Sequence, residues 1–228
     1  MTPVERPSPN FDDRPSATPI DMLVLHYTGM ESAEAALARL CDAAAPGANR
    51  VSAHYVIDED GATLSMVDEA ARAWHAGVAS WRGEPDVNGR SIGIELVNPG
   101  HEFGYRDFPE AQMAALEELA SDILVRHPIS ARNVVGHSDV APGRKTDPGE
   151  KFDWTRLAAA GIGLWPGDGD SADAVDVPAM LSEYGYDITD EAAAITAFQR
   201  HFYPETLDGR ADSGTAGRLR ALLDLCKT

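Results

Sequence analysis

Cysteine is scarce in this chain: Cys41 and Cys226 are the only two among 228 residues. Two cysteines are too few for a cysteine-based zinc site. They lie far apart in segments with helical patterns, which favours free thiols over a disulfide.

Positive charge is also scarce, since 19 lysines and arginines face 37 aspartates and glutamates, for a formal net charge of -18. Such a chain repels polyanions, so we expect no nucleic-acid partner. No run of about 18 apolar residues occurs, so we expect no transmembrane segment. The first residues also lack the apolar core of a signal peptide, which favours the cytoplasm.

The remaining composition is that of an ordinary globular protein, with 43% hydrophobic and 25% charged residues. The length allows one well-buried domain and a small second one. We divide the chain into an N-terminal arm (1–18), a main domain (19–166), a linker rich in Gly, Asp and Pro (167–176) and a tail with three short helical patterns (177–228).

Strand and helix patterns interleave in the main domain. Ser32 is suited to cap a helix that follows it, and Pro109 is suited to open a longer helix ending before His127-Pro128. The expected strands are MLVLHY, the hairpin VSAHYVID with TLSMV, RSIGIELVN and NVVGH. This order predicts an α/β fold with a mixed sheet flanked by helices, followed by a small three-helix unit.

Two histidines, His26 and His137, each end an apolar strand. If these strands run in parallel, both imidazoles lie at the same edge of the sheet, near Asp147 on a proline-stiffened loop. Two imidazoles and a carboxylate form a common catalytic zinc shell, with water as fourth ligand. A single strand-end histidine is more often a packed, hydrogen-bonded residue, so spacing alone leaves both interpretations open. Asp139 is an alternative ligand, although a capping role in the turn fits it better.

Five sequence motifs favour the zinc shell over packed, hydrogen-bonded histidines. LVLHYTG, SAHYVID, AWHAG, NGRSIGIELVN and GHSDVAPGRKTDPG follow one another between about Pro19 and Trp165. In this order they resemble the zinc-dependent N-acetylmuramoyl-L-alanine amidases of the type-2 amidase family. The resemblance implies hydrolysis of the amide between N-acetylmuramic (or anhydromuramic) acid and L-alanine, in peptidoglycan or in released muropeptides.

The resemblance also assigns residues. It implies one zinc ion per chain, held by His26, His137 and Asp147, with water as the nucleophile. It implies Glu95 as general base and acid, and Lys145 as the group that stabilises the oxyanion. These roles suit amide hydrolysis, which needs an activated water, a proton carrier and a stabilised tetrahedral intermediate.

Weaker candidates surround these five residues. His54 either faces the site or is buried, His75 lines a substrate groove or packs in the core, and Asn88 is a candidate contact to the stem peptide. The other histidines, His101, His127 and His201, are expected at the surface or at helix ends. A non-catalytic peptidoglycan-recognition module and a lytic endolysin or toxin are the alternative functions.

The tail resembles the small three-helix peptidoglycan-binding domain appended to many wall hydrolases, which favours the periplasm or cell envelope. The motifs are GYD, AFQRHF and DG, followed by a leucine-striped helix. A tether of this kind raises the local substrate concentration without changing the chemistry. We therefore expect a chain ending near Pro166 to cleave small soluble muropeptides at close to the full-length rate. The alternative is a helical extension that only stabilises the fold.

Overall fold

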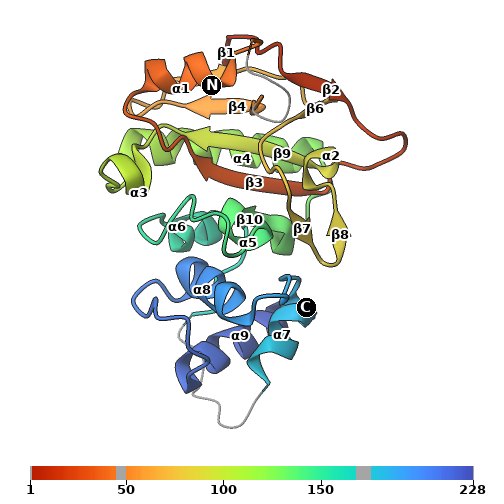
Figure 1. Cartoon of the computed structure of the whole chain (residues 1–228), viewed down its shortest axis with the longest axis vertical. Helices are drawn as coiled ribbons and strands as arrows, with labels where there is room; N and C mark the ends of the chain where they lie inside the picture. Colours follow the sequence, from red (N-terminus) through yellow and green to blue (C-terminus); the bar gives the residue numbers. More distant parts are fainter. Residues whose placement is uncertain (1, 45–49, 168–175, 228) are drawn as a thin grey trace.

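The computed structural model describes residues 2–44, 50–167 and 176–227. Within this part of the chain a six-stranded sheet has the order β1-β5-β4-β9-β3-β10 (Figure 1). The strands are β1 (Val4–Glu5), β3 (Met22–Tyr27), β4 (Tyr55–Ile57), β5 (Thr63–Ser65), β9 (Ser91–Leu96) and β10 (Val134–Gly136). Two small pairs stand beside it: β2 (Phe11–Asp13) with β6 (Ala71–Ala73), and β7 (Ser80–Trp81) with β8 (Glu84–Pro85).

The sheet is mixed, as predicted. Strand β3 runs parallel to both of its neighbours, β9 and β10, and β4 runs parallel to β9. Strands β4 and β5 form the predicted antiparallel hairpin. Parallel strands at the centre place the carboxyl ends of β3, β9 and β10 at one edge of the sheet.

Helices surround this sheet. Ser32 accepts a hydrogen bond from the backbone N–H of Ala35, which confirms the predicted cap. The long helix α4 begins directly after Pro109 and ends at Arg126, also as predicted. The helices are α1 (Ala33–Leu40), α2 (Val87–Arg90), α3 (Gly100–Phe103), α4 (Glu110–Arg126), α5 (His137–Val140), α6 (Trp154–Ala159), α7 (Val177–Tyr184), α8 (Glu191–Phe202) and α9 (Ser213–Leu225), with a 3-10 turn at Ala131–Asn133.

The two faces of the sheet are covered differently. Side chains alternate along a strand, so Leu23 and Leu25 point to one face, whereas Val24 and His26 point to the other. The first face packs against α4 in one buried cluster that includes Leu116 and Ile123. This packing buries that face of the central strands and leaves the face of His26 for the site.

Helix α1 covers part of this second face, where Leu40 packs against Val56 of β4. The C-terminal helices α7, α8 and α9 occur where the tail predicted helices. They lie below β10, α5 and α6 in Figure 1, and α8 contacts α5. They share one buried cluster with the main domain. Its members include Val24, Val135 and Val140 from the main domain, and Leu181, Phe198 and Leu219 from the tail. The boundary between the two predicted domains is therefore crossed by continuous apolar packing, and residues 168–175 of the predicted linker lie outside the described residues.

The N-terminal arm is more ordered than its sequence suggests. It supplies β1 at the sheet edge and β2, which pairs with β6. The guanidinium of Arg14 then donates hydrogen bonds to the carbonyls of Asn88, Gly89 and Ser91. The arm is thereby attached to the segment just before β9.

Two further expectations concern cysteine and the membrane. Cys41 and Cys226 are free, as predicted, and both are half-buried. Among the described residues, no helix has both the length and the apolar character needed to span a bilayer.

Candidate metal centre and active site

The site forms where the central parallel strands end. His26 of β3 is the register partner of Glu95 of β9, so both side chains point to the same face of the sheet. His137 follows β10 directly and begins α5. The parallel pairing of β3 with β10 thus brings the two strand-end histidines together, as the sequence predicted.

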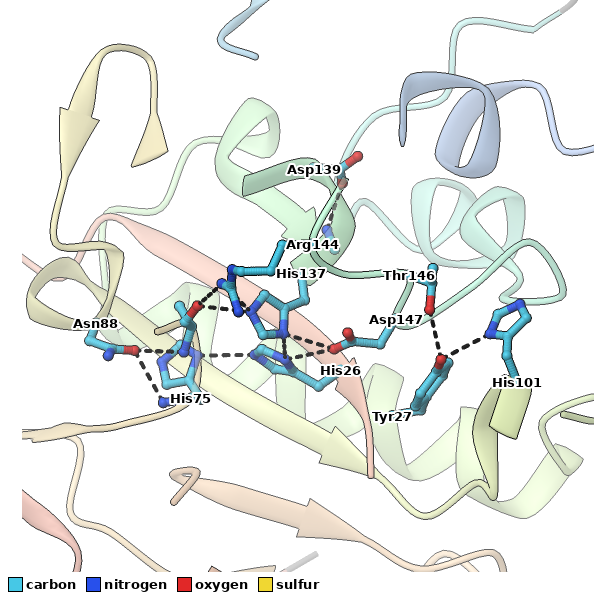
Figure 2. A network of polar contacts seen from close by, with 12 residues as sticks. His26, Tyr27, His75, Asn88, His101, His137, Asp139, Arg144, Thr146 and Asp147 are labelled. Atoms are coloured by element: carbon cyan, nitrogen blue, oxygen red, sulfur yellow. Dashed lines mark hydrogen bonds and ion pairs between the residues drawn. The ribbon is translucent and has the colours of Figure 1, made fainter. Parts of the chain in front are cut away.

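Three ligand-type atoms converge here (Figure 2). The Nδ1 atoms of His26 and His137 lie 2.9 Å apart, and each is close to the Oδ2 atom of Asp147, at 2.9 and 3.0 Å. All three side chains are buried. Asp147 is therefore the third member of the cluster, also as the sequence predicted.

A hydrogen-bond chain behind His26 determines which of its nitrogens carries the proton. The hydroxyl of Ser91 donates to the carbonyl of Val87, so its oxygen accepts from Nε2–H of His75 at 3.1 Å. The Nδ1 atom of neutral His75 is then an acceptor, and Nε2–H of His26 donates to it at 3.0 Å. The lone pair of His26 Nδ1 is left facing Asp147.

His137 is arranged in the same way. Its Nε2 atom lies 2.9 Å from the carbonyl oxygen of Ala76, which can only accept, so Nε2 carries the proton. Arg144 lies farther from this nitrogen, at 3.4 Å, and donates to the carbonyls of Ala76 and Val78. The Nδ1 atom of His137, on the opposite side of the ring, therefore also points at the cluster.

This donor set suits a zinc ion. Two imidazole lone pairs and a carboxylate oxygen, packed within 3.0 Å of one another, repel each other unless a cation lies between them. Zinc binds imidazole and carboxylate at about 2.0–2.2 Å, which sets ligand atoms of one shell only a few ångströms apart. Nitrogens whose opposite N–H is held by a second residue are typical of zinc-ligating histidines.

The pKa shifts of the cluster residues also favour metal binding. Burial, together with the nearby His137, lowers the pKa of His26 to about 4, so this imidazole is neutral at pH 7. Burial opposes ionisation of Asp147, but its contacts with His137 and His26 outweigh burial and hold its pKa well below the ordinary value. A neutral imidazole and an ionised carboxylate are the protonation states that metal binding requires.

A cavity of about 370 Å³ opens over the cluster, and both Glu95 and Lys145 line it. Among the described residues, no donor reaches the buried Oε2 atom of Glu95. Burial and the charge of Asp147 raise the pKa of Glu95 well above its ordinary value, while Lys145 acts in the opposite direction. The cavity thus contains a carboxyl group that can hold a proton, and a nearby cation.

The mouth of this cavity carries polar aromatic side chains. The hydroxyl of Tyr27 lies 2.9 Å from Thr146 Oγ1 and 2.9 Å from His101 Nδ1 (Figure 2). His101 stacks on Tyr105, with 4.3 Å between the ring centroids. His101 is exposed here, and His127 follows the end of α4, as predicted for both.

The three predicted substrate contacts lie mostly below the cavity. His54 is fully buried, and its Nδ1 accepts from the backbone N–H of Gly93. The side-chain oxygen of Asn88 accepts from the backbone N–H groups of His75 and Ala76. Asn88 thus holds the loop that supports both histidines of the cluster, and only His75 of the three lines the cavity. Direct contact of these residues with substrate stays a prediction.

Gly93 explains how His75 comes so close to the sheet. A Cβ atom at this position would lie 2.5 Å from the imidazole ring of His75. Any larger residue here would push the ring away from His26. The glycine of the IGIE motif is thus a requirement of the site.

Asp139 and His201 both lie outside the metal cluster. Asp139 does not join the cluster, because its Oδ2 accepts from the backbone N–H of Gly136, the capping role that fitted it better. His201 lies in the last turn of α8, one of the two places expected for it, but its side chain is not at the surface: it is 3% exposed and lies against Trp154 and Phe202. It belongs to the amphipathic helix α8, whose inner face packs on α5 and α6.

Sequence reasoning missed Ser91 and Arg144. Ser91, Gly93 and Glu95 alternate along β9, so the period of a strand places all three on one face. This pattern was the available signal for Ser91. Arg144 reaches its carbonyl partners across 66 and 68 residues of sequence, and no local pattern indicates such contacts.

The family model described as N-acetylmuramoyl-L-alanine amidase matches residues 16–150. The chain is 36% identical to the N-acetylmuramoyl-L-alanine amidase AmiD of Escherichia coli over 235 residues, covering 90% of this chain and 83% of that protein. It is 37% identical over 169 residues to the 1,6-anhydro-N-acetylmuramyl-L-alanine amidase AmpD of Citrobacter freundii, covering 67% of this chain and 87% of that protein.

A solved structure agrees with these matches. The complex of AmiD from E. coli with anhydro-N-acetylmuramic acid-L-Ala-D-gamma-Glu-L-Lys superposes with a TM-score of 0.79 at 36% identity. The superposition covers 92% of this chain and 91% of that one, so it includes most of the C-terminal helices as well as the sheet.

Proposed function

Because this chain belongs to the N-acetylmuramoyl-L-alanine amidase family, we propose that it cleaves the amide between N-acetylmuramic acid, or its anhydro form, and the L-alanine of the attached peptide. The observation that carries this proposal is the convergence of His26, His137 and Asp147 below a cavity that also contains Glu95 and Lys145. The relatives named above supply the substrate class.

His26, His137 and Asp147 would hold one zinc ion per chain. When bound, zinc lowers the pKa of water to about 7 and polarises a carbonyl group, which are the two requirements of amide hydrolysis near neutral pH. The orientation of the two histidine ligands does not depend on the ion alone, because His75 and the Ala76 carbonyl already hold their rings.

Glu95 is the proposed proton carrier. Its register position next to His26 places the carboxyl group at the cluster, and its Oε2 atom has no donor among the described residues. A carboxyl group with a raised pKa can accept the proton of the attacking water and then deliver it to the leaving amine nitrogen. Both transfers require the same position, beside the scissile bond.

Lys145 is the proposed oxyanion partner. It is half-buried at the cavity wall, two residues before Asp147. An ammonium group there can donate to the oxygen of the scissile carbonyl as negative charge develops on it. Such a charge-assisted bond strengthens in the transition state, so it contributes to the rate more than to substrate binding.

The C-terminal helices α7–α9 are proposed to contact peptidoglycan, as the motifs of the tail suggest. This role is separate from the chemistry, because none of the described tail residues lines the cavity. Their extensive packing on the main domain means that any bound polymer is held at a constant distance from the cavity.

Mass spectrometry of products tests the proposal. The full-length protein, with its zinc content measured, is incubated with anhydro-N-acetylmuramyl peptide and with sacculi, with and without a chelator. We expect about one zinc per chain and release of free peptide with an L-alanine amino terminus, abolished by chelation. Active protein without metal, or cleavage at another bond, would contradict the proposal. A His137→Ala variant should lose both zinc and activity.

A further inference from the structure

A buried carboxylate connects the metal cluster with the C-terminal helices. Asp139 lies in α5, two residues after His137, and is 1% exposed. Its Oδ2 atom accepts from the backbone N–H of Gly136 at 2.7 Å. Gly136 is the residue before His137, so this bond holds the turn through which β10 delivers its histidine.

The other partners of Asp139 come from the tail. Nδ1 of His201, on α8, lies 2.7 Å from Oδ2, and the hydroxyl of Tyr186 donates to Oδ1 at 2.7 Å. Both donors are 3% exposed. A carboxylate that is buried needs such donors, since an uncompensated buried charge is strongly unfavourable.

The ring of His201 is itself held in place. It stacks on Trp154 of α6 and on Phe202, with centroid distances of 3.7 Å in both cases and interplanar angles of 19° and 7°. Two nearly parallel neighbours at this distance enclose the imidazole between them. Its Nδ1–H is therefore directed at Asp139 before any metal or substrate binds.

We propose that His201 and Tyr186 are positioning residues for the metal ligand His137. They act through Asp139, whose bond to Gly136 sets the turn before the ligand. The inference rests on the proposed function, because it assigns the C-terminal helices a part in holding the zinc shell in addition to contact with the polymer. Residues behind metal ligands commonly affect metal affinity by about 10–100-fold.

The experiment compares full-length variants that remove one donor each. Tyr186→Phe deletes only a hydroxyl, and His201→Phe keeps a flat ring between Trp154 and Phe202 while deleting Nδ1–H. Tyr184→Phe is the matched control, because Tyr184 lies in the same buried cluster and stacks on Tyr186 but is not a donor to Asp139. Zinc dissociation constants come from competition with a chromophoric chelator, and unfolding temperatures are measured on the zinc-free proteins.

We expect Tyr186→Phe and His201→Phe to weaken zinc binding about 10-fold or more, and Tyr184→Phe to bind like the wild type. If both donor variants bind zinc as tightly as the wild type, the inference is wrong, even where they unfold at lower temperature. Equal weakening in Tyr184→Phe would also overturn it, since general packing would then be the cause. A wild-type protein that binds no zinc would instead reject the proposed function.

Discussion

The Nε2 atom of His26 lies 3.0 Å from Nδ1 of His75, so the ring that faces Asp147 is held from behind by a second imidazole. His75 in turn depends on Ser91, whose hydroxyl fixes its tautomer. Neither supporting residue belongs to the group of converging ligand atoms, which is His26, His137 and Asp147. Their effect on the site is therefore one of orientation.

This relay can be tested with Ser91→Ala and His75→Phe. Ser91→Ala leaves His75 free to adopt the other tautomer, so we expect a modest loss of zinc affinity. His75→Phe removes the acceptor for His26 Nε2–H and should weaken zinc binding about 10–100-fold. Chelator competition measures both. Wild-type affinity in His75→Phe would mean that the His26 ring needs no partner.

Glu95→Gln separates proton transfer from metal binding. The amide side chain has nearly the same shape but cannot carry a proton, so we expect unchanged zinc content and a loss of roughly 10²–10⁴-fold in turnover. Elemental analysis and steady-state kinetics on anhydromuropeptide measure the two quantities. Normal turnover would require a different proton carrier.

Lys145→Ala should lower kcat more than it raises KM, because an oxyanion partner acts mainly in the transition state. Lys151→Ala is the control: Lys151 lies on the same connecting segment but pairs with Asp107 outside the cavity. Steady-state kinetics of both variants measure kcat and KM, and Lys151→Ala should resemble the wild type in both. A change confined to KM in Lys145→Ala would indicate that the lysine binds the ground-state substrate.

The acid stability of the fold should depend on Glu69. Burial raises its pKa, but hydrogen bonds from Arg126, His127 and Tyr55 outweigh this and lower it from 4.5 to about 2. A depressed folded-state pKa stabilises the fold above pH 4.5, and this contribution disappears as the pH falls toward 2. The effect is modest, because Glu69 is only partly buried.

Thermal unfolding at several pH values measures this contribution. Glu69→Gln should unfold at lower temperature than the wild type at pH 6, and the difference should shrink between pH 4.5 and pH 2. Glu59→Gln, which removes an exposed pair with Arg106, serves as the control. A constant difference across the range would show that the charge of Glu69 is not the cause.

Truncation at Pro166 should destabilise the protein. The sequence alone predicted a removable tether and full activity on soluble muropeptides. The shared cluster changes this expectation, because removal of α7–α9 exposes Trp81 and Val140, which are 0% and 1% exposed in the full chain. We expect a lower unfolding temperature and a reduced rate on soluble substrate. If the truncated chain has the stability and rate of the full-length protein, the tail is a removable tether, as the sequence alone predicted.

Local patterns predicted much of this fold. The apolar run of β3 and the long stripe of α4 require burial on known faces, so their positions follow from period alone. The meeting of His26 with His137 followed from one further assumption, parallel pairing.

Contacts that join distant segments were not predictable in this way. β1 and β2 are short and exposed, and their sequences VE and FDD carry no strand period. The burial of His201 depends on Trp154, 47 positions earlier. Contacts of this kind form only in the folded chain, so a short window of sequence does not contain both partners.

The in-register pairing of β3 with β9 limits the insertions and deletions that these strands can accept. His26 and Glu95 are register partners on neighbouring parallel strands. The position of the proton carrier relative to the ligand therefore depends on this register. A single insertion or deletion inside β9 would turn Glu95 toward α4 and present Ile94 or Leu96 to the cavity instead. Changes of length are therefore not tolerable within these two strands, because the strand register determines which side chains face the cavity.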